Sequence, residues 1–206
     1  MSEKSTDSVT FKQIMTKILD AIRALSNCQC VGIRLHNSAD YPYYVQEGFP
    51  GFFILKENSL CMKDSEGKHI LDKRGSPLLE CMCGNVIKGQ FDPKLVFFTE
   101  NGSFWTNSTT HLLANTTEKE RQSRTRNMCH NSGYESVALI PLRGGNGNVG
   151  LIQMNDPREN MFTTKLIKNY ESLAEYIGEI ISNALEIQKN MSEFSNMINN
   201  FESVKK

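Results

Sequence analysis

Two short apolar runs in the C-terminal half of the chain predict the centre of a β-sheet. The runs cover residues 137–142 and 149–154, and a segment rich in glycine and asparagine separates them. Valine, isoleucine and leucine in short runs favour strands, and the glycines and asparagines between them supply the positive-φ residues of a hairpin turn. Because both runs are almost continuously apolar, we expect two central strands, each covered on at least one face. Asn155, Asp156 and Pro157 then end the second strand.

The N-terminal region predicts a helix followed by a second hairpin. Ser8 or Thr10 could cap the helix, whose apolar side chains recur three and four residues apart. These side chains are Phe11, Ile14, Met15, Ile18, Ala21, Ile22 and Leu25. Residues 30–35 predict a short strand and residues 41–45 its hairpin partner. Residues 49–53 then predict a turn followed by apolar anchors.

The middle of the chain predicts a loop, a helix, an irregular segment and a second helix. Residues 63–75 are polar and contain two glycines, which is typical of a surface loop. An apolar helical face follows, with Gly89 as its terminator, and consists of Leu79, Met82, Cys83, Val86 and Ile87. Residues 91–110 contain aromatic side chains without periodicity, and such a long irregular segment is often a binding loop. Residues 118–129 predict a charged helix that carries Arg121, Arg124 and Arg126.

A long helix with a heptad pattern is predicted at the C-terminus. It starts near Thr163, and its apolar side chains alternate three and four residues apart. They are Ile177, Ile180, Ala184, Ile187, Met191, Phe194, Ile198 and Phe201. We expect a parallel homodimer through this helix, joined by the N-terminal helix in a four-helix bundle. The alternative is an unpartnered amphipathic tail, because Met and Phe are not typical of a coiled-coil seam.

Composition places the chain among ordinary globular proteins. It has 206 residues, enough for one domain with helical extensions, and we expect a flexible segment at 1–10, one domain at 11–186 and a coiled-coil extension at 187–206. Its 23 basic and 23 acidic side chains create no net field toward nucleic acid or an anionic membrane. No membrane-spanning run and no signal peptide are seen. A cytoplasmic protein is expected, with its six cysteines as thiols, ligands or redox partners.

The order of these elements and three long stretches resemble GAF domains, which are small-molecule sensor modules. The stretches cover residues 80–110, 124–143 and 150–162 and are similar to a subgroup found in bacterial and archaeal sensor histidine kinases. The resemblance extends over about residues 12–185. It implies an α+β fold with an antiparallel sheet of five or six strands, helices on one side and a ligand pocket on the other. It also implies signalling through long terminal helices to a histidine kinase or regulator. One fold hosts many functions, so the ligand stays open.

Four cysteines are the candidate metal or redox residues: Cys61, Cys81, Cys83 and Cys129. Four thiolates could hold zinc or an iron–sulfur cluster, although such sites favour C-x2-C spacing. A C-x-C pair on a regular helix directs its side chains about 200° apart, so both reach one ion only if the backbone turns, which Gly84 could permit. The alternative is that Cys83 is a small buried apolar residue.

Histidine and arginine residues extend the candidate site. Haem-binding relatives in this group suggest a cysteine thioether link with a histidine ligand, but no C-x-x-C-H motif is present. His111 and His130 are the candidate axial or metal ligands, with polar surface histidines as the alternative. Arg121 and Arg126 could pair with an anionic ligand, although a solvated helix face is the simpler interpretation of Arg121.

An aromatic wall with polar neighbours is the candidate ligand-binding surface. Trp105 stands beside Asn107 and other hydroxyl and amide side chains, which suits a mostly apolar pocket with a few polar groups. The alternative is that Trp105 is simply a large core residue.

Two other activities known among GAF domains can be compared with the residues. Members that bind cyclic nucleotides carry an Asn-Lys pair, then a Phe and an Asp-Glu pair. Here Asn155 is followed by Asp156, and no acidic pair follows Phe162, which argues against that activity. Free-methionine sulfoxide reductases are GAF enzymes that use several cysteines, and they stay as an alternative.

The sequence therefore favours a non-enzymatic sensor. We hypothesise that ligation or oxidation at the cysteines between residues 81 and 129 moves the neighbouring loop. The strands would pass this change to the C-terminal helix and shift the dimer between two registers.

Overall fold

The computed structural model describes residues 10–121, 125–145 and 147–204, with side chains as far as Asn199. The predicted flexible segment 1–10 lies outside these residues except for Thr10, and Ser8 and Arg124 also lie outside them. The helices are α1 (Phe11–Ser26), α2 (Gly51–Glu57), α3 (Cys81–Lys88), α4 (Thr109–Asn115), α5 (Met128–Asn131) and α6 (Thr164–Val204). The strands are β1 (Cys30–Leu35), β2 (Tyr43–Glu47), β3 (Phe104–Thr106), β4 (Ser136–Gly144) and β5 (Gly147–Asp156).

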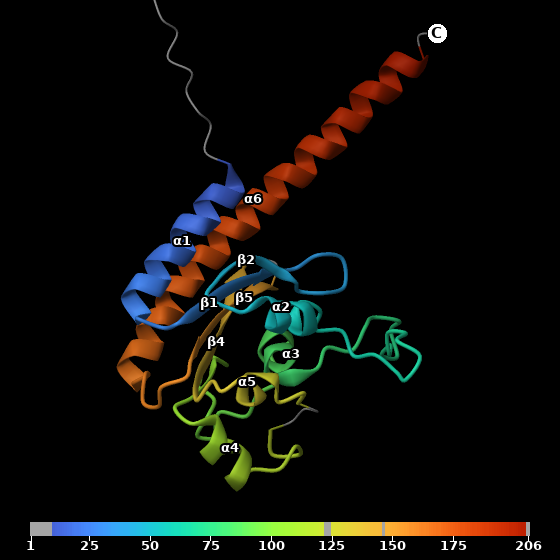
Figure 1. Ribbon diagram of the computed structural model, residues 1–206. Helices are drawn as coiled ribbons and strands as arrows, with labels where there is room; N and C mark the ends of the chain where they lie inside the picture. The colour runs from blue at the N-terminus through green and yellow to red at the C-terminus, as the bar shows by residue number, and fades with distance from the viewer. Residues whose placement is uncertain (1–9, 122–124, 146, 205–206) are drawn as a thin grey trace, which may run out of the picture.

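The strands form one antiparallel sheet with the order β2-β1-β5-β4-β3. This arrangement confirms the predicted α+β class and the position of the β4–β5 hairpin at the centre of the sheet (Figure 1). Both strands run further into the glycine-rich turn than predicted, up to the pair Gly144 and Gly147. Gly147 has a φ of 111°, a value that glycine adopts without a steric penalty.

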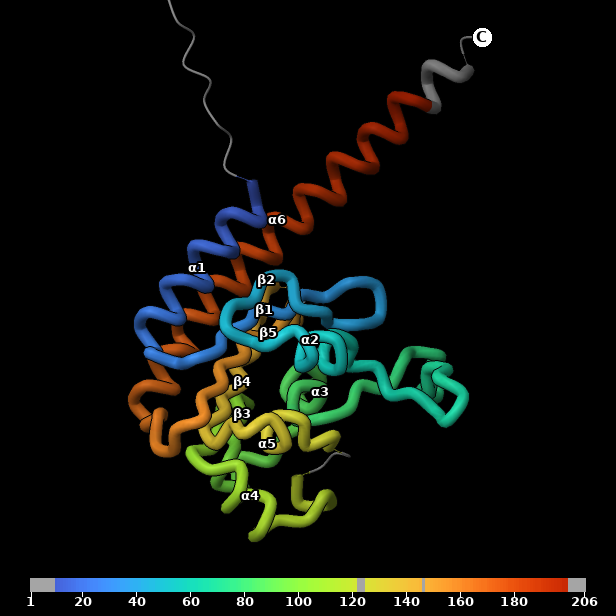
Figure 2. Tube along the Cα trace, in the orientation of Figure 1, coloured from blue at the N-terminus to red at the C-terminus, as the bar shows by residue number. Residues whose placement is uncertain are grey.

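The sheet separates two apolar clusters because successive side chains on a strand point to opposite faces. On β4, Ala138 and Ile140 belong to the cluster beneath α1 and α6, whereas Val137 and Leu139 belong to the cluster on the opposite face. Helices α1 and α6 lie side by side on the first face, and α2 and α3 lie on the second (Figures 1 and 2). Both central strands are therefore covered on two faces.

Helix α1 confirms the predicted N-terminal helix but buries a different stripe. Thr10 and Gln13 form a capping box at its start, and Asn27 ends it in the left-handed conformation. The buried side chains are Met15, Leu19, Ile22 and Ser26. Ile14 and Leu25, which belong to the predicted apolar pattern, are exposed at 39% and 71%. The core therefore uses only part of the apolar surface of this helix.

Two predictions in the N-terminal half were displaced. The partner of β1 lies two residues later than predicted, at 43–47 in place of 41–45, and its pairing is irregular between Ile33 and Arg34. The predicted turn at residues 49–53 leads directly into α2, which begins after Pro50 and buries Phe53. Short helices of this kind have too few turns to produce a clear periodicity.

The predicted charged helix over residues 118–129 is wrong in its described part. Residues 118–121 form a turn, residues 125–127 have no regular structure, and only Met128–Asn131 are helical. The reason is that Arg121 is buried with its backbone oxygen bonded to Asn85, while Arg126 bonds to the carbonyl oxygen of Ser59, and such tertiary contacts override helix propensity.

The other predicted elements of the middle segment are largely confirmed. Helix α3 ends at Gly89 in the left-handed conformation, and residues 63–75 form a surface loop that projects from the body (Figure 2). The segment 91–110 is mostly irregular, but it contains the short strand β3 and the start of α4. Its aromatic residues Phe97 and Phe98 are buried as expected.

Helix α6 is 41 residues long and begins one residue after the predicted start. Its first half packs on the sheet, and its second half extends away from the body (Figure 1). Every described side chain from Leu185 to Asn199 is exposed. None of the helices, taken over their described residues, is both long and apolar enough to span a bilayer.

Gly178 sets how closely α6 approaches β4. A Cβ atom at this position would lie 2.1 Å from the backbone oxygen of Arg143. We expect Gly178→Ala to lower the free energy of unfolding by about 1–3 kcal/mol, because overpacking outweighs the gain of about 1 kcal/mol in helix propensity. Urea denaturation would measure the change. Gly51→Ala in α2 is the control, since its Cβ would meet no atom within 4 Å; equal stability of the two variants would contradict the prediction.

Candidate ligand-binding site

A cavity of about 70 Å³ lies on the second face of the sheet, and we name it the β4 cavity. Its floor consists of Val137 and Leu139 from β4 and Phe104 from β3. Its walls come from α2, α3, α4, Arg121 and residues 125–130, and consist of Glu57, Cys81, Met82, Cys83, Thr109, Leu112, Leu113, Arg121, Thr125, Asn127, Met128, Cys129 and His130. Most of these side chains are apolar, and the polar ones come mainly from α4 and the segment after it.

Gln153 is the centre of a buried polar network next to this cavity. Its Oε1 accepts hydrogen bonds from Tyr43 Oη at 2.7 Å and from Arg34 Nε at 3.3 Å. Its Nε2 donates to Asn155 Oδ1 at 3.1 Å and faces Cys129 Sγ at 3.8 Å. Strand β5 places Gln153 and Asn155 on the cavity face because they alternate with apolar residues of the other face. A satisfied buried network of this kind fixes the positions of its members.

Arg34 is fully buried and its charge is compensated without a direct ion pair. Its guanidinium donates to the carbonyl oxygens of Tyr41 at 3.0 Å, Asn58 at 3.2 Å and Glu57 at 2.7 Å. It also lies 3.6 Å from the centre of the Tyr43 ring, a cation–π contact. These contacts tie β1 to α2 and give a buried cation the partners it requires.

Arg126 joins the segment after α4 to α2 and α3. Its Nε lies 3.3 Å from Glu57 Oε1 and 3.5 Å from Glu80 Oε1, and both carboxylates are buried. Its Nη2 donates to the carbonyl oxygen of Ser59 at 3.0 Å. Burial raises the pKa of Glu57, and the charges of Arg126 and Arg34 oppose that shift. The predicted ligand-binding residue Arg126 thus holds one wall of the cavity together.

Three of the predicted cysteines meet at the β4 cavity. Cys81 has a φ of 64° at the start of α3, and its Sγ accepts a hydrogen bond from the backbone N–H of Arg126 at 3.1 Å. Cys83 Sγ donates to Gln153 Oε1 at 3.9 Å, while Cys129 contacts the amide of the same side chain. The irregular backbone at Cys81, and not at Gly84, is where the C-x-C pair departs from regular helix geometry.

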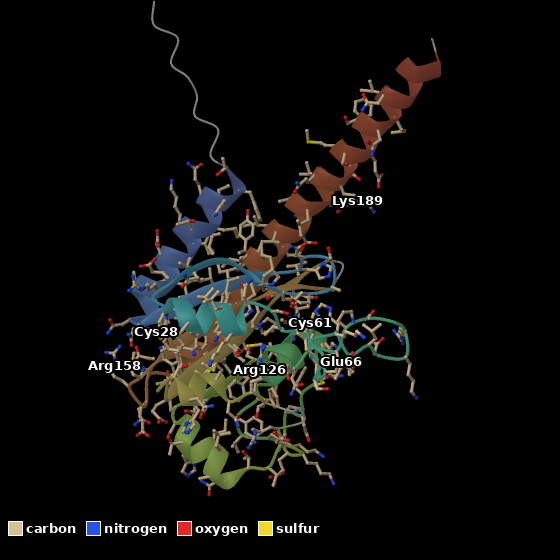
Figure 3. The ribbon with its side chains drawn as sticks, turned by 45° about the vertical axis from the view of Figure 1, so that its right-hand side comes forward. Cys28, Cys61, Glu66, Arg126, Arg158 and Lys189 are labelled. Carbon is tan, nitrogen blue, oxygen red and sulfur yellow. The ribbon has the colours of Figure 1, made fainter. Side chains whose placement is uncertain are left out.

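The remaining cysteines lie elsewhere. Cys61 contacts the carbonyl oxygen of Ala39 at 3.6 Å beside the projecting loop. Cys28 lies beneath the terminal helices, and Figure 3 shows it well away from Cys61 and Arg126. Cys30 contacts Tyr134 Oη at 3.2 Å. The predicted four-cysteine centre is therefore not brought together by the fold.

The described residues contain no group of three or more His, Cys, Asp or Glu side chains placed to hold one metal ion. A zinc or iron–sulfur centre therefore does not fit the observed arrangement of Cys81, Cys83 and Cys129. Haem does not fit either, because pockets for molecules of that size occupy at least about 300 Å³ and the β4 cavity occupies about 70 Å³.

The other predicted ligand residues line a second, shallower hollow or serve the fold. Trp105, Asn107 and His111 border a space of about 260 Å³ at the surface beside β3. Asn107 bonds both backbone groups of Phe162, at 2.8 and 2.9 Å, and so ties β3 to the segment before α6. His130 does line the β4 cavity, where its Nδ1 lies 3.1 Å from Thr109 Oγ1.

Gln153, Arg34 and Thr109 were not predicted as site residues. The first two had a signal in the sequence, because each is a polar residue inside an otherwise apolar strand. A polar side chain at such a position must find buried partners. Thr109 had no such signal, because its role depends on the fold of the irregular segment.

Comparison with known proteins shows the GAF fold. No protein-family model and no curated protein matches the sequence. The GAF domain of a phosphoenolpyruvate-protein phosphotransferase from Acinetobacter aligns with a TM-score of 0.57 and 12% identity over 89% of this chain and 89% of that one. A domain assigned to a two-component sensor histidine kinase from Sinorhizobium meliloti 1021 gives 0.52 and 13% over 92% and 99%.

An enzyme shares the same architecture. The type II free methionine-R-sulfoxide reductase from Thermoplasma acidophilum aligns with a TM-score of 0.50 and 10% identity over 81% of this chain and 89% of that one. At such identities the likeness concerns the fold alone. The GAF fold implied by the resemblance is thus confirmed, whereas the function has to be argued from the site.

The ion pairs of Arg126 lead to a testable prediction. Arg126→Gln leaves the buried carboxylates of Glu57 and Glu80 without their ion-pair partner, so we expect a loss of about 2–4 kcal/mol in the free energy of unfolding at neutral pH. The pKa of Glu57 is raised in the folded state above its unfolded-state value near 4.5. The stability that such a carboxyl contributes is fully present below the unfolded-state pKa and is lost as pH rises through the folded-state pKa. Removing the arginine raises the folded-state pKa of Glu57 further. The difference in free energy of unfolding between wild type and variant should therefore become smaller as pH falls toward 4.5.

Urea denaturation of both proteins at several pH values measures this effect. Adding Glu57→Gln to the variant removes one unpaired charge and should recover part of the stability at neutral pH. A deficit that does not change with pH would contradict the role given to Glu57.

The burial of the thiols at the cavity leads to a further prediction. Burial raises the pKa of Cys83 to about 12 and also raises the pKa values of Cys81 and Cys129. The thiolate is the reactive form, so iodoacetamide at neutral pH should modify Cys83 at least about 100-fold more slowly in the native protein than in urea. Mass spectrometry of digested samples measures the rates. An introduced cysteine on the exposed projecting loop, Ser65→Cys, is the positive control, and rapid native modification of Cys83 would contradict the expectation.

Proposed function

We propose that this chain is a non-enzymatic sensory module that binds a small molecule in the β4 cavity and passes the change to α6 within a parallel homodimer. The position of β4 is the observation that carries the proposal. Val137 and Leu139 line the cavity, whereas Ala138 and Ile140 on the same strand pack beneath the terminal helices. A ligand that displaces β4 would therefore also move the side chains on its opposite face, on which α6 packs.

The second half of α6 supports the homodimer. Its described apolar side chains follow the heptad pattern and are exposed in one copy of the chain. Their exposures include 61% for Ile187, 68% for Met191 and 62% for Phe194. A second copy presents the same stripe and would bury both surfaces as a coiled coil. The exposed Ile14 and Leu25 of α1 would extend this interface into a four-helix bundle, whose output would reach a histidine kinase or regulator.

Ligand binding is favoured over the thiol-based alternatives by the state of the cysteines. A redox sensor and a sulfoxide reductase both need a thiolate that attacks or is attacked. Burial raises the pKa values of Cys81, Cys83 and Cys129, which keeps these thiols protonated at neutral pH. In the proposed function they act as small apolar wall residues, which was the structural alternative for Cys83.

Disulfide crosslinking of α6 tests both parts of the proposal. Met191→Cys places a thiol on the heptad stripe, so we expect an interprotomer disulfide to form under mild oxidation if the helices pair in parallel. The low-molecular-mass fraction of a cell extract should change the rate of this crosslinking. Leu112→Trp, which fills the β4 cavity from α4, should abolish the extract effect while leaving the crosslink intact.

Ala114→Trp is the matched control because it adds the same side chain to an exposed position of the same helix. This variant should still respond to the extract. A monomer in sedimentation and no crosslink would overturn the dimer. A crosslinking rate that the extract leaves unchanged in every variant would overturn the coupling between cavity and helix.

A further inference from the structure

Arg121 is a buried cation in the wall of the β4 cavity. Its exposed fraction is only 5%, so the solvated helix face considered for it is wrong. Its backbone oxygen accepts a hydrogen bond from Asn85 Nδ2 at 2.9 Å, which fixes the residue against α3. Its Nη1 donates to the carbonyl oxygen of Thr116 at 2.6 Å and to Thr116 Oγ1 at 2.8 Å.

The guanidinium of Arg121 is incompletely satisfied by the described residues. Its buried Nε has no hydrogen-bond partner among them, and no described carboxylate lies within 4.0 Å of its nitrogen atoms. The neighbouring Glu120 instead accepts hydrogen bonds from the backbone and hydroxyl of Thr117 at 2.7 and 2.8 Å, at the surface. An arginine is almost never buried without a partner, because the loss of its hydration must be offset.

The buried Nε of Arg126 also forms no hydrogen bond, but the other two arginines on this face of the sheet have charge compensation that Arg121 lacks. Arg34 is surrounded by carbonyl oxygens and stacked on Tyr43. Arg126 is paired with the carboxylates of Glu57 and Glu80. Glu57 also lines the β4 cavity, but its carboxylate is occupied by Arg126. Within the described residues, Arg121 is therefore the cavity-lining cation that still has bonding capacity.

We propose that Arg121 binds the carboxylate of a small monocarboxylic acid in the β4 cavity. The inference rests on the proposed function, since it names the ligand class of that same site. A guanidinium presents paired N–H donors that match a carboxylate. The unpartnered Nε of Arg121 is one donor of such a pair, and Asn127 adds an amide group to the lining of the same cavity.

The rest of the cavity specifies a short apolar tail. Its floor and α3 wall are built from Val137, Leu139, Phe104 and Met82, which cannot bond to a second charged group. A cavity of about 150 Å³ holds benzene, so the 70 Å³ of the β4 cavity suits a chain of about three or four carbon atoms. An inorganic oxyanion would leave these apolar walls without contacts, and a dicarboxylate would bury a second charge.

Isothermal titration calorimetry of the full chain tests the proposal with propionate and butyrate at constant ionic strength. Propionamide and butyramide are the neutral probes of the same shape. We expect each acid to bind at least about tenfold more tightly than its amide. Arg121→Gln should remove this preference, and Arg121→Lys, which keeps the charge, should restore part of it.

Two controls separate Arg121 from general charge effects and from folding. Arg74→Gln removes the same charge from the exposed projecting loop and should leave the preference unchanged. The comparison of acid with amide on the wild-type chain does not depend on any variant, so a misfolded Arg121→Gln protein leaves the test intact. Leu112→Trp should block both acids and amides.

The outcomes distinguish this inference from the proposed function. If acids and amides bind equally well to the wild type, the role of Arg121 is overturned. If Leu112→Trp blocks both kinds of probe in that case, the β4 cavity is still the ligand site. No binding of any probe would overturn the monocarboxylate class. The proposed function would then still stand if the extract changed α6 crosslinking, and it would fall separately if the extract did not.

Discussion

The burial of β4 and β5 on both faces is the constraint on which the rest of the structure depends. Each strand divides its side chains between the cluster under α1 and α6 and the cluster around the β4 cavity. A shift of one residue in register would exchange the two faces of a strand. The alternation of side chains between the two faces therefore fixes the sheet register, the surface on which α6 packs and the floor of the cavity. The two clusters are separate in composition but not mechanically independent, because they share these strands.

Polar groups on the cavity face follow from that double burial. A polar residue in a central strand has no route to solvent, so Arg34 and Gln153 have to compensate each other and their neighbours. Their network fixes β1, β5 and α2 relative to one another and fills the space on one side of the cavity. The remaining space lies between α3 and the segment after α4, where Arg121 has no carboxylate partner among the described residues.

The sequence predicted those parts whose structure depends on local pattern. The β4–β5 hairpin, α1, α3 and α6 each carry enough apolar periodicity to be found. Residues 118–121 and 125–127 were missed because their conformation is decided by contacts far along the chain: the backbone oxygen of Arg121 bonds to Asn85, and the side chain of Arg126 bonds to Ser59. The site was predicted only in part, because its remaining residues are also placed by contacts between distant parts of the chain. Cys81, Cys83 and Cys129 do meet, but nothing local indicated that Cys61 faces Ala39 or that Trp105 packs on the opposite cluster.

The contact between α6 and β4 explains how a small change in the cavity could have a large effect in the proposed sensor. Gly178 and Gly144 allow the helix backbone to meet the strand backbone directly, so no flexible side chain can absorb a displacement at that point. Packed interfaces of this kind move as units. Helix α6 has 41 residues and is about 60 Å long at 1.5 Å per residue, with more than its last third beyond the sheet. A small tilt at Gly178 therefore becomes a larger displacement at the heptad stripe. In the proposed sensor, a small ligand is therefore sufficient, because the length of α6 converts a small movement at the cavity into a large displacement at the end of the helix.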